Sequence, residues 1–213
     1  MRTNQLVSQF IISAALGCVA LGSAAAQGKI RGTMRLGAEM GGDKVIQFQY
    51  ADGSTPDVTA GGGLLISAGA ILQVVEINSA SVDAQLNAGW KYRTIPKASN
   101  QEASWSRFPV EALLAYNTPV GLRISAGGVV HLANKLEASG AAVNGSVDFK
   151  TTPGFVVQTE YLFRNGLAID ARYTGMKYRI DGSGSESIDG SSFGIGGSVY
   201  FGGSKASKPT TKR

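Results

Sequence analysis

The feature that most constrains the fold is a strict alternation of apolar and polar residues, which recurs along most of the 213-residue chain. The stretch 81–93, SVDAQLNAGWKYR, shows it clearly. Its alternate positions are apolar: Val82, Ala84, Leu86, Ala88, Trp90 and Tyr92. Because successive side chains of a β-strand point to opposite faces, a period of two predicts a strand with one apolar and one polar face. If the apolar faces point inward, the chain is a soluble β-protein. If they point outward to lipid, it is a membrane barrel.

The same alternation predicts eight strands. They cover residues 30–50, 64–74, 81–93, 107–117, 122–132, 155–163, 167–173 and 193–201. Residues 41–43 of the first strand, Gly-Gly-Asp, interrupt the pattern, and we interpret them as a bulge after which Ile46, Phe48 and Tyr50 continue the apolar row. Strands of this length are long enough to cross a membrane at a tilt.

Short and long connections alternate between these strands. The short ones lie near residues 77–81, 117–120 and 164–166, and the last contains an Asn-Gly hairpin signal. The longer ones lie near residues 51–56, 94–104, 134–148 and 181–190 and are rich in Gly, Ser, Asn and Asp. Bacterial outer-membrane barrels have short periplasmic turns and longer outer loops. We therefore predict an all-β fold, an eight-stranded antiparallel up-and-down transmembrane β-barrel over residues 27–203.

The alternative is a soluble sandwich or lipocalin-like barrel with the apolar rows as its core. Several apolar rows are half alanine and glycine, which would fill a soluble core poorly. Aromatic residues gather toward strand ends, as in the girdles of membrane barrels: Trp90, Tyr92, Trp105, Phe108, Tyr116, Tyr161, Phe163, Tyr200 and Phe201. Both signs of charge recur on the polar face, where they would pair inside a barrel. The predicted interior network comprises Arg35, Glu39, Asp83, Lys91, Arg93, Arg107, Glu111, Arg123, His131, Glu160, Asp170 and Arg172.

The two ends of the chain differ from this body. Residues 1–26 contain Arg2, an apolar run and Ala24-Ala25-Ala26, which together predict a cleaved signal peptide. The only cysteine, Cys18, lies within it, so the mature chain has no disulfide. An imperfect lipoprotein signal around Cys18 is the other interpretation. The formal net charge of +5 falls to +4 without Arg2. Much of it lies in residues 204–213, a flexible basic tail that we expect in the periplasm, either solvated or against anionic lipid.

Because of its predicted signal peptide and its pattern of strands and loops, the chain resembles the small eight-stranded outer-membrane proteins, the OmpA/OmpW-like group with an outer membrane protein beta-barrel domain. The resemblance covers about residues 27–203, and its ending, Gly-Gly-Ser-Val-Tyr-Phe, is similar to the signal that such barrels show their assembly machinery. In that signal Gly196, Val199 and Phe201 would be recognised. Twelve residues follow Phe201, and Gly194 stands where the family usually has a polar residue. The resemblance implies export to the outer membrane of a Gram-negative bacterium.

The single histidine of the chain, His131, is a candidate catalytic residue. His131-Leu132-Ala133-Asn134 is similar to the His-x-Ser-Asn stretch of outer-membrane lipid A deacylases, but Ala133 occupies the place of the serine. Ser125 is about 20 Å away along the strand, too far to be activated by His131. Glu137 and Ser139 lie in a predicted loop without defined geometry. We therefore expect His131 to belong to an interior hydrogen-bond network, with lipid A hydrolysis as a third-ranked function.

No cofactor, catalytic or metal site is predicted. Asp181, Glu186 and Asp189 lack the spacing of a calcium loop, the glycine clusters precede no helix pattern, and the positive charge is too dispersed for nucleic acid. The interior of eight strands is just wide enough for side chains to fill. The sequence thus favours a non-enzymatic, monomeric barrel with a structural or surface-interaction role, in contact with outer-membrane lipids and the barrel assembly machinery. The alternative is a narrow channel for small solutes.

Overall fold

The computed structural model describes residues 30–47, 57–98, 101–139, 145–180 and 187–202. Its strands are β1 (Ile30–Met40), β2 (Lys44–Gln47), β3 (Asp57–Thr59), β4 (Gly63–Ile77), β5 (Ala80–Ala98), β6 (Gln101–Asn117), β7 (Leu122–Ser139), β8 (Gly145–Thr151), β9 (Gly154–Leu162), β10 (Leu167–Gly175), β11 (Lys177–Ile180), β12 (Ser187–Asp189) and β13 (Ser192–Phe201). The described part contains no helix of the length and apolarity that a membrane crossing requires. The expected signal peptide and basic tail lie outside the described residues, as do Phe48, Tyr50 and the connection 51–56.

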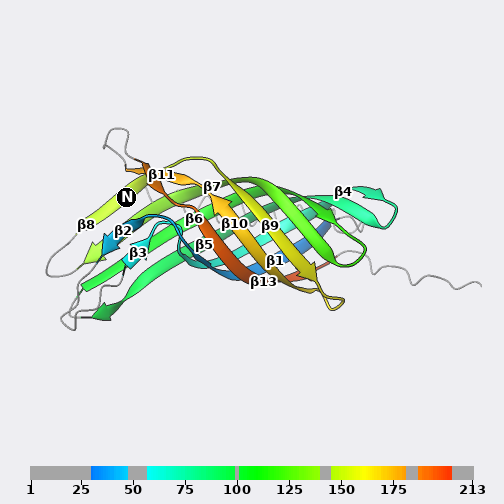
Figure 1. The fold of residues 1–213 in the computed structure, drawn as a ribbon, viewed down its shortest axis with the longest axis horizontal. Coiled ribbons are helices and arrows are strands. Elements are labelled where there is room, and N and C mark those ends of the chain that lie inside the picture. The colour runs from blue at the N-terminus through cyan, green and yellow to red at the C-terminus, as the bar shows by residue number, and fades with distance from the viewer. Residues whose placement is uncertain (1–29, 48–56, 99–100, 140–144, 181–186, 203–213) are drawn as a thin grey trace, which may run out of the picture.

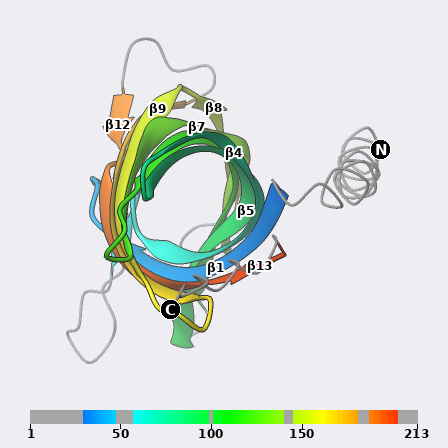
Figure 2. The ribbon, with the colours of Figure 1, turned by 90° about the vertical axis from the view of Figure 1, so that its right-hand side faces the viewer.

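Eleven of these strands form one antiparallel sheet that closes on itself (Figure 1). β7 pairs with β8 near one end and with β9 near the other, so β8 and β9 are successive parts of one barrel strand. β10 and β11 are likewise successive parts of one barrel strand, and so are β12 and β13, because β10 pairs with β13 and β11 pairs with β12. β1 pairs with β4 on one side and β13 on the other, which closes the ring seen in Figure 2. The fold is a closed eight-stranded antiparallel up-and-down barrel, which confirms the predicted architecture.

Within the barrel the apolar row of each strand points outward. Leu86 is 64% exposed and Ile195 71% exposed, whereas Arg107 on the opposite face is fully buried. β1, β9, β10 and β13 have 11, 9, 9 and 10 residues, and a tilted strand needs about 9 to 11 residues to span a bilayer. The outer surface therefore has the polarity and height of a lipid-facing wall.

The connections at one end are short. β4 and β5 are joined through Asn78, which has a φ of 56°. At the third turn, the backbone N of Gly166 donates to the Phe163 carbonyl over 3.1 Å, and Gly166 has a φ of 85°. We call this the turn end, and it agrees with the short connections that the sequence predicts.

Toward the other end, the strands are interrupted at neighbouring positions, which we call the collar: residues 41–43, 60–62, 152–153, 176 and 190–191. Backbone hydrogen bonds join these breaks across the sheet. The backbone N of Gly190 donates to the Met176 carbonyl over 3.0 Å, and that of Gly61 donates to the Gly41 carbonyl over 3.0 Å. The predicted bulge at residues 41–43 is wrong, because the chain there leaves the barrel and forms a separate two-stranded sheet of β2 and β3.

The barrel continues beyond the collar as a rim, formed by residues 93–98 of β5, 101–107 of β6, 134–139 of β7, and β8, β11 and β12. Here the polarity of the wall is reversed, with apolar residues inside. The buried cluster comprises Val58, Ala60, Ala103, Trp105, Leu136, Phe149, Met176 and Tyr178, while Lys135 and Glu137 are exposed on the outside. A wall with this polarity is suited to water rather than lipid.

The reversal explains where the prediction of long loops fails. Residues 94–104 and 134–148 are predicted as loops but lie mostly in β5, β6, β7 and β8. β7 contains a bulge at Ala133–Asn134 opposite Arg107, and Ala133 has a φ of 45°. After this bulge the inward positions change phase, from His131 to Asn134 and Leu136. The row of apolar residues on the outer face therefore ends at the bulge, although the strand continues. For this reason the sequence pattern predicts a loop there.

Most predicted girdle aromatics lie on the outer wall, in two groups. Trp90, Tyr92 and Phe108 lie on the collar side, and Tyr116, Tyr161, Phe163 and Phe201 lie on the turn side. Phe155 and Phe193, which the prediction did not include, are also exposed on the collar side. Two assignments are wrong. Trp105 is fully buried in the rim, and the Tyr200 hydroxyl points inward to donate to Glu160 over 2.7 Å. Period two places both on the inward face, with Arg107 and Ser198 respectively.

Candidate functional site: the charged interior of the barrel

The charged side chains that fill the barrel come from β1, β5, β6, β7, β9 and β10, whereas the inward row of β4 buries Leu65 and Ile71. Of the predicted interior residues, eleven are buried: Arg35, Glu39, Asp83, Lys91, Arg107, Glu111, Arg123, His131, Glu160, Asp170 and Arg172. Arg93 is half-buried, and its Nη2 atom lies 3.5 Å from the Asp57 carbonyl in β3. Since charges in a low-dielectric interior are costly unless they are paired, the positions of their partners determine what this interior can do.

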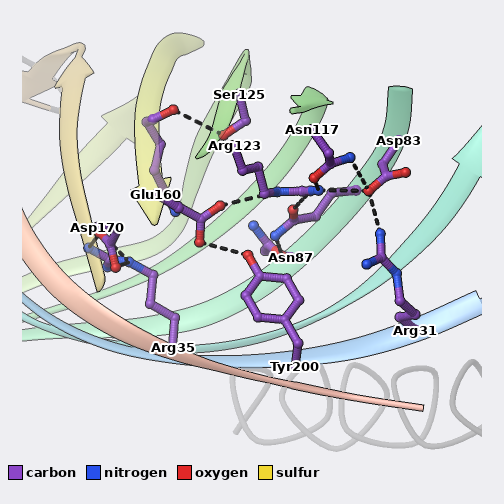
Figure 3. Close-up of polar contacts among 12 residues, drawn as sticks. Arg31, Arg35, Asp83, Asn87, Asn117, Arg123, Ser125, Glu160, Asp170 and Tyr200 are labelled. Atoms are coloured by element: carbon purple, nitrogen blue, oxygen red, sulfur yellow. Dashed lines mark hydrogen bonds and ion pairs between the residues drawn. The ribbon is translucent and has the colours of Figure 1, made fainter. Parts of the chain in front are cut away.

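Nearest the turn end, Arg123 on β7 connects four strands (Figure 3). Its Nη1 atom lies 2.7 Å from the Asp83 carboxylate on β5, and its Nε atom lies 3.2 Å from Glu160 on β9. Asp83 also pairs with Arg31 of β1 over 2.5 Å. Glu160 accepts the Tyr200 hydroxyl of β13 over 2.7 Å. One guanidinium thus neutralises two carboxylates that each have a second partner.

At mid-height, Arg35 of β1 pairs with Asp170 of β10 (Figure 3). The Arg35 Nη2 atom lies 2.6 Å from Asp170 Oδ1, and its Nε atom lies 3.1 Å from both carboxylate oxygens. Gly196 of β13 lies directly against this pair, because a Cβ at Gly196 would be 2.7 Å from Arg35 Nη2 and 2.8 Å from Asp170 Oδ2. The absence of a side chain at Gly196 makes room for the ion pair.

A third group crosses the barrel below the collar. Arg172 of β10 pairs with Glu111 of β6 over 2.5 Å and, through Nε, with Glu39 of β1 over 3.1 Å. Glu39 also binds Lys91 of β5 over 2.6 Å and accepts the Ser192 hydroxyl over 2.8 Å. Charges from three strands that are not neighbours in the ring, β1, β6 and β10, therefore meet in the interior. They form a continuous filling rather than a lining.

At the collar, Arg107 of β6 has backbone partners. It donates to the carbonyls of Ala60 and Gly62 through Nη1 and Nη2, and its guanidinium lies 4.6 Å from the centroid of the Trp105 ring. These contacts fix the segment after β3 across the barrel mouth. Above Arg107 lies the apolar cluster of the rim, which closes the interior from this side.

His131 faces inward as expected, and its Nδ1 atom lies 2.7 Å from the Tyr178 hydroxyl. That hydroxyl in turn donates to the Met176 sulfur over 3.2 Å. Ser125 lies elsewhere on β7, with its hydroxyl 3.5 Å from the Gln158 carbonyl. Ser125 and His131 thus have different partners, and His131 and Tyr178 contribute to the closed end of the barrel.

Several interior partners were missed in the sequence, namely Arg31, Gln85, Asn87, Asn117, Asn134, Tyr178 and Tyr200. Asn117 donates to Asp83 over 2.8 Å and Asn87 to Glu111 over 3.0 Å. Asn134 accepts the Trp105 indole N–H at the β7 bulge. Gln85 and Asn87 share the polar row of Asp83 in β5, so extending the search from charged to all polar inward residues would have found them.

The residues of the predicted assembly signal lie on both faces of β13. Val199 and Phe201 point outward and are 47% and 51% exposed, whereas Gly196 faces the interior. Phe201 lies in register with Gly32 of β1, at the seam where the first and last barrel strands meet.

No protein-family model and no curated protein matches this chain. Among solved structures, it is similar to Ail, the attachment invasion locus protein of Yersinia pestis, in complex with the heparin analogue sucrose octasulfate. The identity is 13%, the TM-score is 0.48, and the match covers 81% of this chain and 99% of that one. It is also similar to Neisserial surface protein A (12% identity, TM-score 0.44, 81% and 96% covered). A third is OprG from Pseudomonas aeruginosa (12% identity, TM-score 0.41, 82% and 96% covered).

At these identities the similarity concerns the fold alone. The described residues form a closed eight-stranded antiparallel barrel.

Proposed function

We propose that the protein is an integral barrel of the Gram-negative outer membrane, non-enzymatic and non-conducting, which holds its rim above the bilayer for contact with ligands or surfaces. The observation that carries this proposal is the filled interior: ion pairs between non-neighbouring strands follow one another from Arg31–Asp83 at the turn end to Lys91–Glu39 and Arg172–Glu111 below the collar. A barrel filled in this way serves as an anchor and a platform.

The outer wall supports a membrane location. Its apolar band is bounded by aromatic residues on both sides, and the polarity reverses at the collar. With the turn end in the periplasm, the rim lies outside the cell. The predicted signal peptide, the assembly signal of Gly196, Val199 and Phe201, and the periplasmic basic tail belong to the same proposal, as do outer-membrane lipids and the assembly machinery as partners of a monomeric barrel.

The interior also bears on the channel alternative. A conducting path would need water between the two walls, but Arg172 bridges Glu111 and Glu39 from three different strands. Arg107 and the apolar cluster then close the mouth. Because Lys91, Arg123 and Arg172 each pair with a carboxylate on another strand, opening a path would break several buried ion pairs together.

Three measurements on the refolded mature protein test the proposal. On cold gels the folded barrel should migrate differently from the boiled protein, and it should remain with vesicles after carbonate washing. In planar bilayers it should give no steady single-channel steps. A protein that stays water-soluble without detergent would contradict the membrane location, and reproducible conductance steps would replace the anchor with the channel. Lipid A mass spectra of cells with and without the protein should be identical, since an acyl-chain difference would indicate a hydrolase.

A further inference from the structure

The outer surface of the barrel is hollowed at the collar, where β9, β10 and β13 give way to β8, β11 and β12. The groove has a volume of about 650 Å³. Its lining includes the bases Lys177 and Arg179 on the rim side and the rings of Phe155 and Tyr173 on the membrane side. One end of the groove is therefore cationic and the other aromatic.

Glycines let the strands approach closely beneath the groove. A Cβ at Gly175 would lie 2.3 Å from the Phe155 ring, and one at Gly154 would lie 2.5 Å from the Gly175 carbonyl and 2.7 Å from the Met176 Cβ. The Phe155 ring consequently lies over Gly175 and forms the floor of the groove on its membrane side. The shape is built by packing of regular strands.

The cations point away from the interior. Tyr178 between them is fully buried, so Lys177 and Arg179 project from the outer face of β11, where both are exposed. Arg179 lies in register with Lys150 of β8, which is also exposed. Three positive side chains thus project from adjacent strands just outside the apolar band.

Among the described residues, the acids near these cations include Asp148, Asp189 and Asp43, whose carboxylate accepts the backbone N–H of Asp189 over 2.8 Å. Asp148 lies in register with Lys135 of β7. Asp189 lies in register with Lys177, and its carboxylate accepts the backbone N–H of Ser191 over 3.0 Å. The charged residues that line the groove itself are Lys177 and Arg179, so its rim side is cationic.

Below the cations, three rings lie side by side on the outer wall. The centroids of Phe155 and Tyr173 are 5.8 Å apart, and those of Tyr173 and Phe193 are 4.7 Å apart. Tyr173 and Lys177 are four positions apart, which is about 13 Å along a strand. A molecule that fits this surface carries negative charge at one end and hydrocarbon at the other, within the reach of one headgroup.

We propose that this groove binds a phosphorylated glycolipid of the outer leaflet, with a phosphate on Lys177 and Arg179 and acyl chains against Phe155, Tyr173 and Phe193. Arginine binds phosphate through two parallel N–H donors, and lysine adds a compact charge. The inference rests on the proposed function, since the collar faces the outer leaflet only if the turn end is periplasmic. The site would fix the depth of the barrel in the membrane.

The test uses native mass spectrometry of the refolded mature protein in detergent with bis-phosphorylated lipid A as the probe. The wild-type protein should retain one lipid A. Lys177→Ala with Arg179→Ala should weaken retention at least tenfold. The matched control is Lys135→Ala, which removes an exposed rim cation that pairs with Glu137 over 2.5 Å outside the groove, and it should bind as the wild type does. Dephosphorylated lipid A should bind as weakly to the wild type as lipid A binds to the double variant.

Equal retention by the double variant, or none by the wild type, would overturn the inference. If an equal concentration of inorganic phosphate displaced lipid A, the groove would bind free phosphate. That result would overturn the claim that its ligand is a lipid. The double variant is also tested for the folded gel mobility and for insertion into vesicles. If it passes both tests, a contrary lipid A result counts against the groove alone and not against the proposed function. A wild-type protein that does not insert would contradict both.

Discussion

At the scale of single residues, each buried charge depends on partners that the sequence places far away. Arg35 and Asp170 are 135 positions apart, and Lys91 and Glu39 are 52 apart. Period two predicts that these residues face inward. Their pairing depends on the stagger of the strands and on closure of the ring, which no local pattern determines.

Arg123 is the interior cation whose loss should cost most. Arg123→Met keeps the length of the side chain but leaves Asp83 and Glu160 with less compensation in the buried interior. We expect a loss of about 3–5 kcal/mol in the free energy of unfolding, measured by denaturant titration in vesicles. Arg164→Met, at an exposed position of a short turn, is the control and should change stability by less than about 0.5 kcal/mol. Equal effects of the two variants would show that the network contributes nothing.

Neighbouring glycines on β13 test the interior packing. A Cβ at Gly196 would meet Arg35, Asp170 and the Leu36 carbonyl within 2.9 Å, whereas one at Gly197 would lie 3.5 Å from its nearest neighbour on the outer wall. Gly196→Ala should therefore destabilise the refolded barrel by about 1–3 kcal/mol, and Gly197→Ala should be close to neutral. Because refolding in vitro needs no assembly machinery, this measurement separates a packing role of Gly196 from a role in the assembly signal. Equal stability of the two variants would contradict the packing role.

At the scale of elements, the collar divides each long strand into parts that meet different solvents. In β6, Phe108 and Leu114 point to lipid below the collar, whereas above it Trp105 turns inward and Ser104 faces outward. The alternation is continuous, but the apolar face changes side. The sequence of β6 is therefore explained by two surroundings, lipid below the collar and water above it.

This change limits what the sequence can predict. The lipid-facing parts of the strands follow from apolar residues at every second position, and the structure confirms them. The rim was predicted as loops because its outer face is polar and its inner face apolar. Trp105 and Tyr200 show a different error: position near a strand end placed them in the girdle, although the period-two pattern puts both on the inward face. In β strands the period is the more reliable guide to orientation, because it follows from backbone geometry.

The segment after β3 should depend on Arg107 for its place across the barrel mouth. Arg107→Met removes the donors to the Ala60 and Gly62 carbonyls. Hydrogen exchange of a peptide covering residues 57–62 should then become at least about tenfold faster, while peptides from β9 and β10 keep their wild-type rates. Lys135→Met is the control and should leave both unchanged. Unaltered exchange at residues 57–62 would contradict the proposed role of Arg107.

At the scale of the whole molecule, the barrel below the collar has the reverse polarity of a soluble protein, and the rim has the ordinary one. The ionic groups that hold the wall together lie along the axis, and the apolar groups lie outside. In water this arrangement would expose large side chains such as Leu36, Leu86 and Ile195, so the molecule needs acyl chains around it.

The two tryptophans of the chain test this arrangement most directly. Trp90 projects outward near the collar and is 42% exposed, whereas Trp105 is fully buried in the rim. In vesicles of brominated lipid, which quench tryptophan on contact, Trp105→Phe leaves only Trp90 and should be strongly quenched. Trp90→Phe leaves only Trp105 and should fluoresce almost as brightly as in unbrominated vesicles. Equal quenching of the two variants, or stronger quenching of Trp105, would contradict an apolar wall facing lipid around a sealed interior.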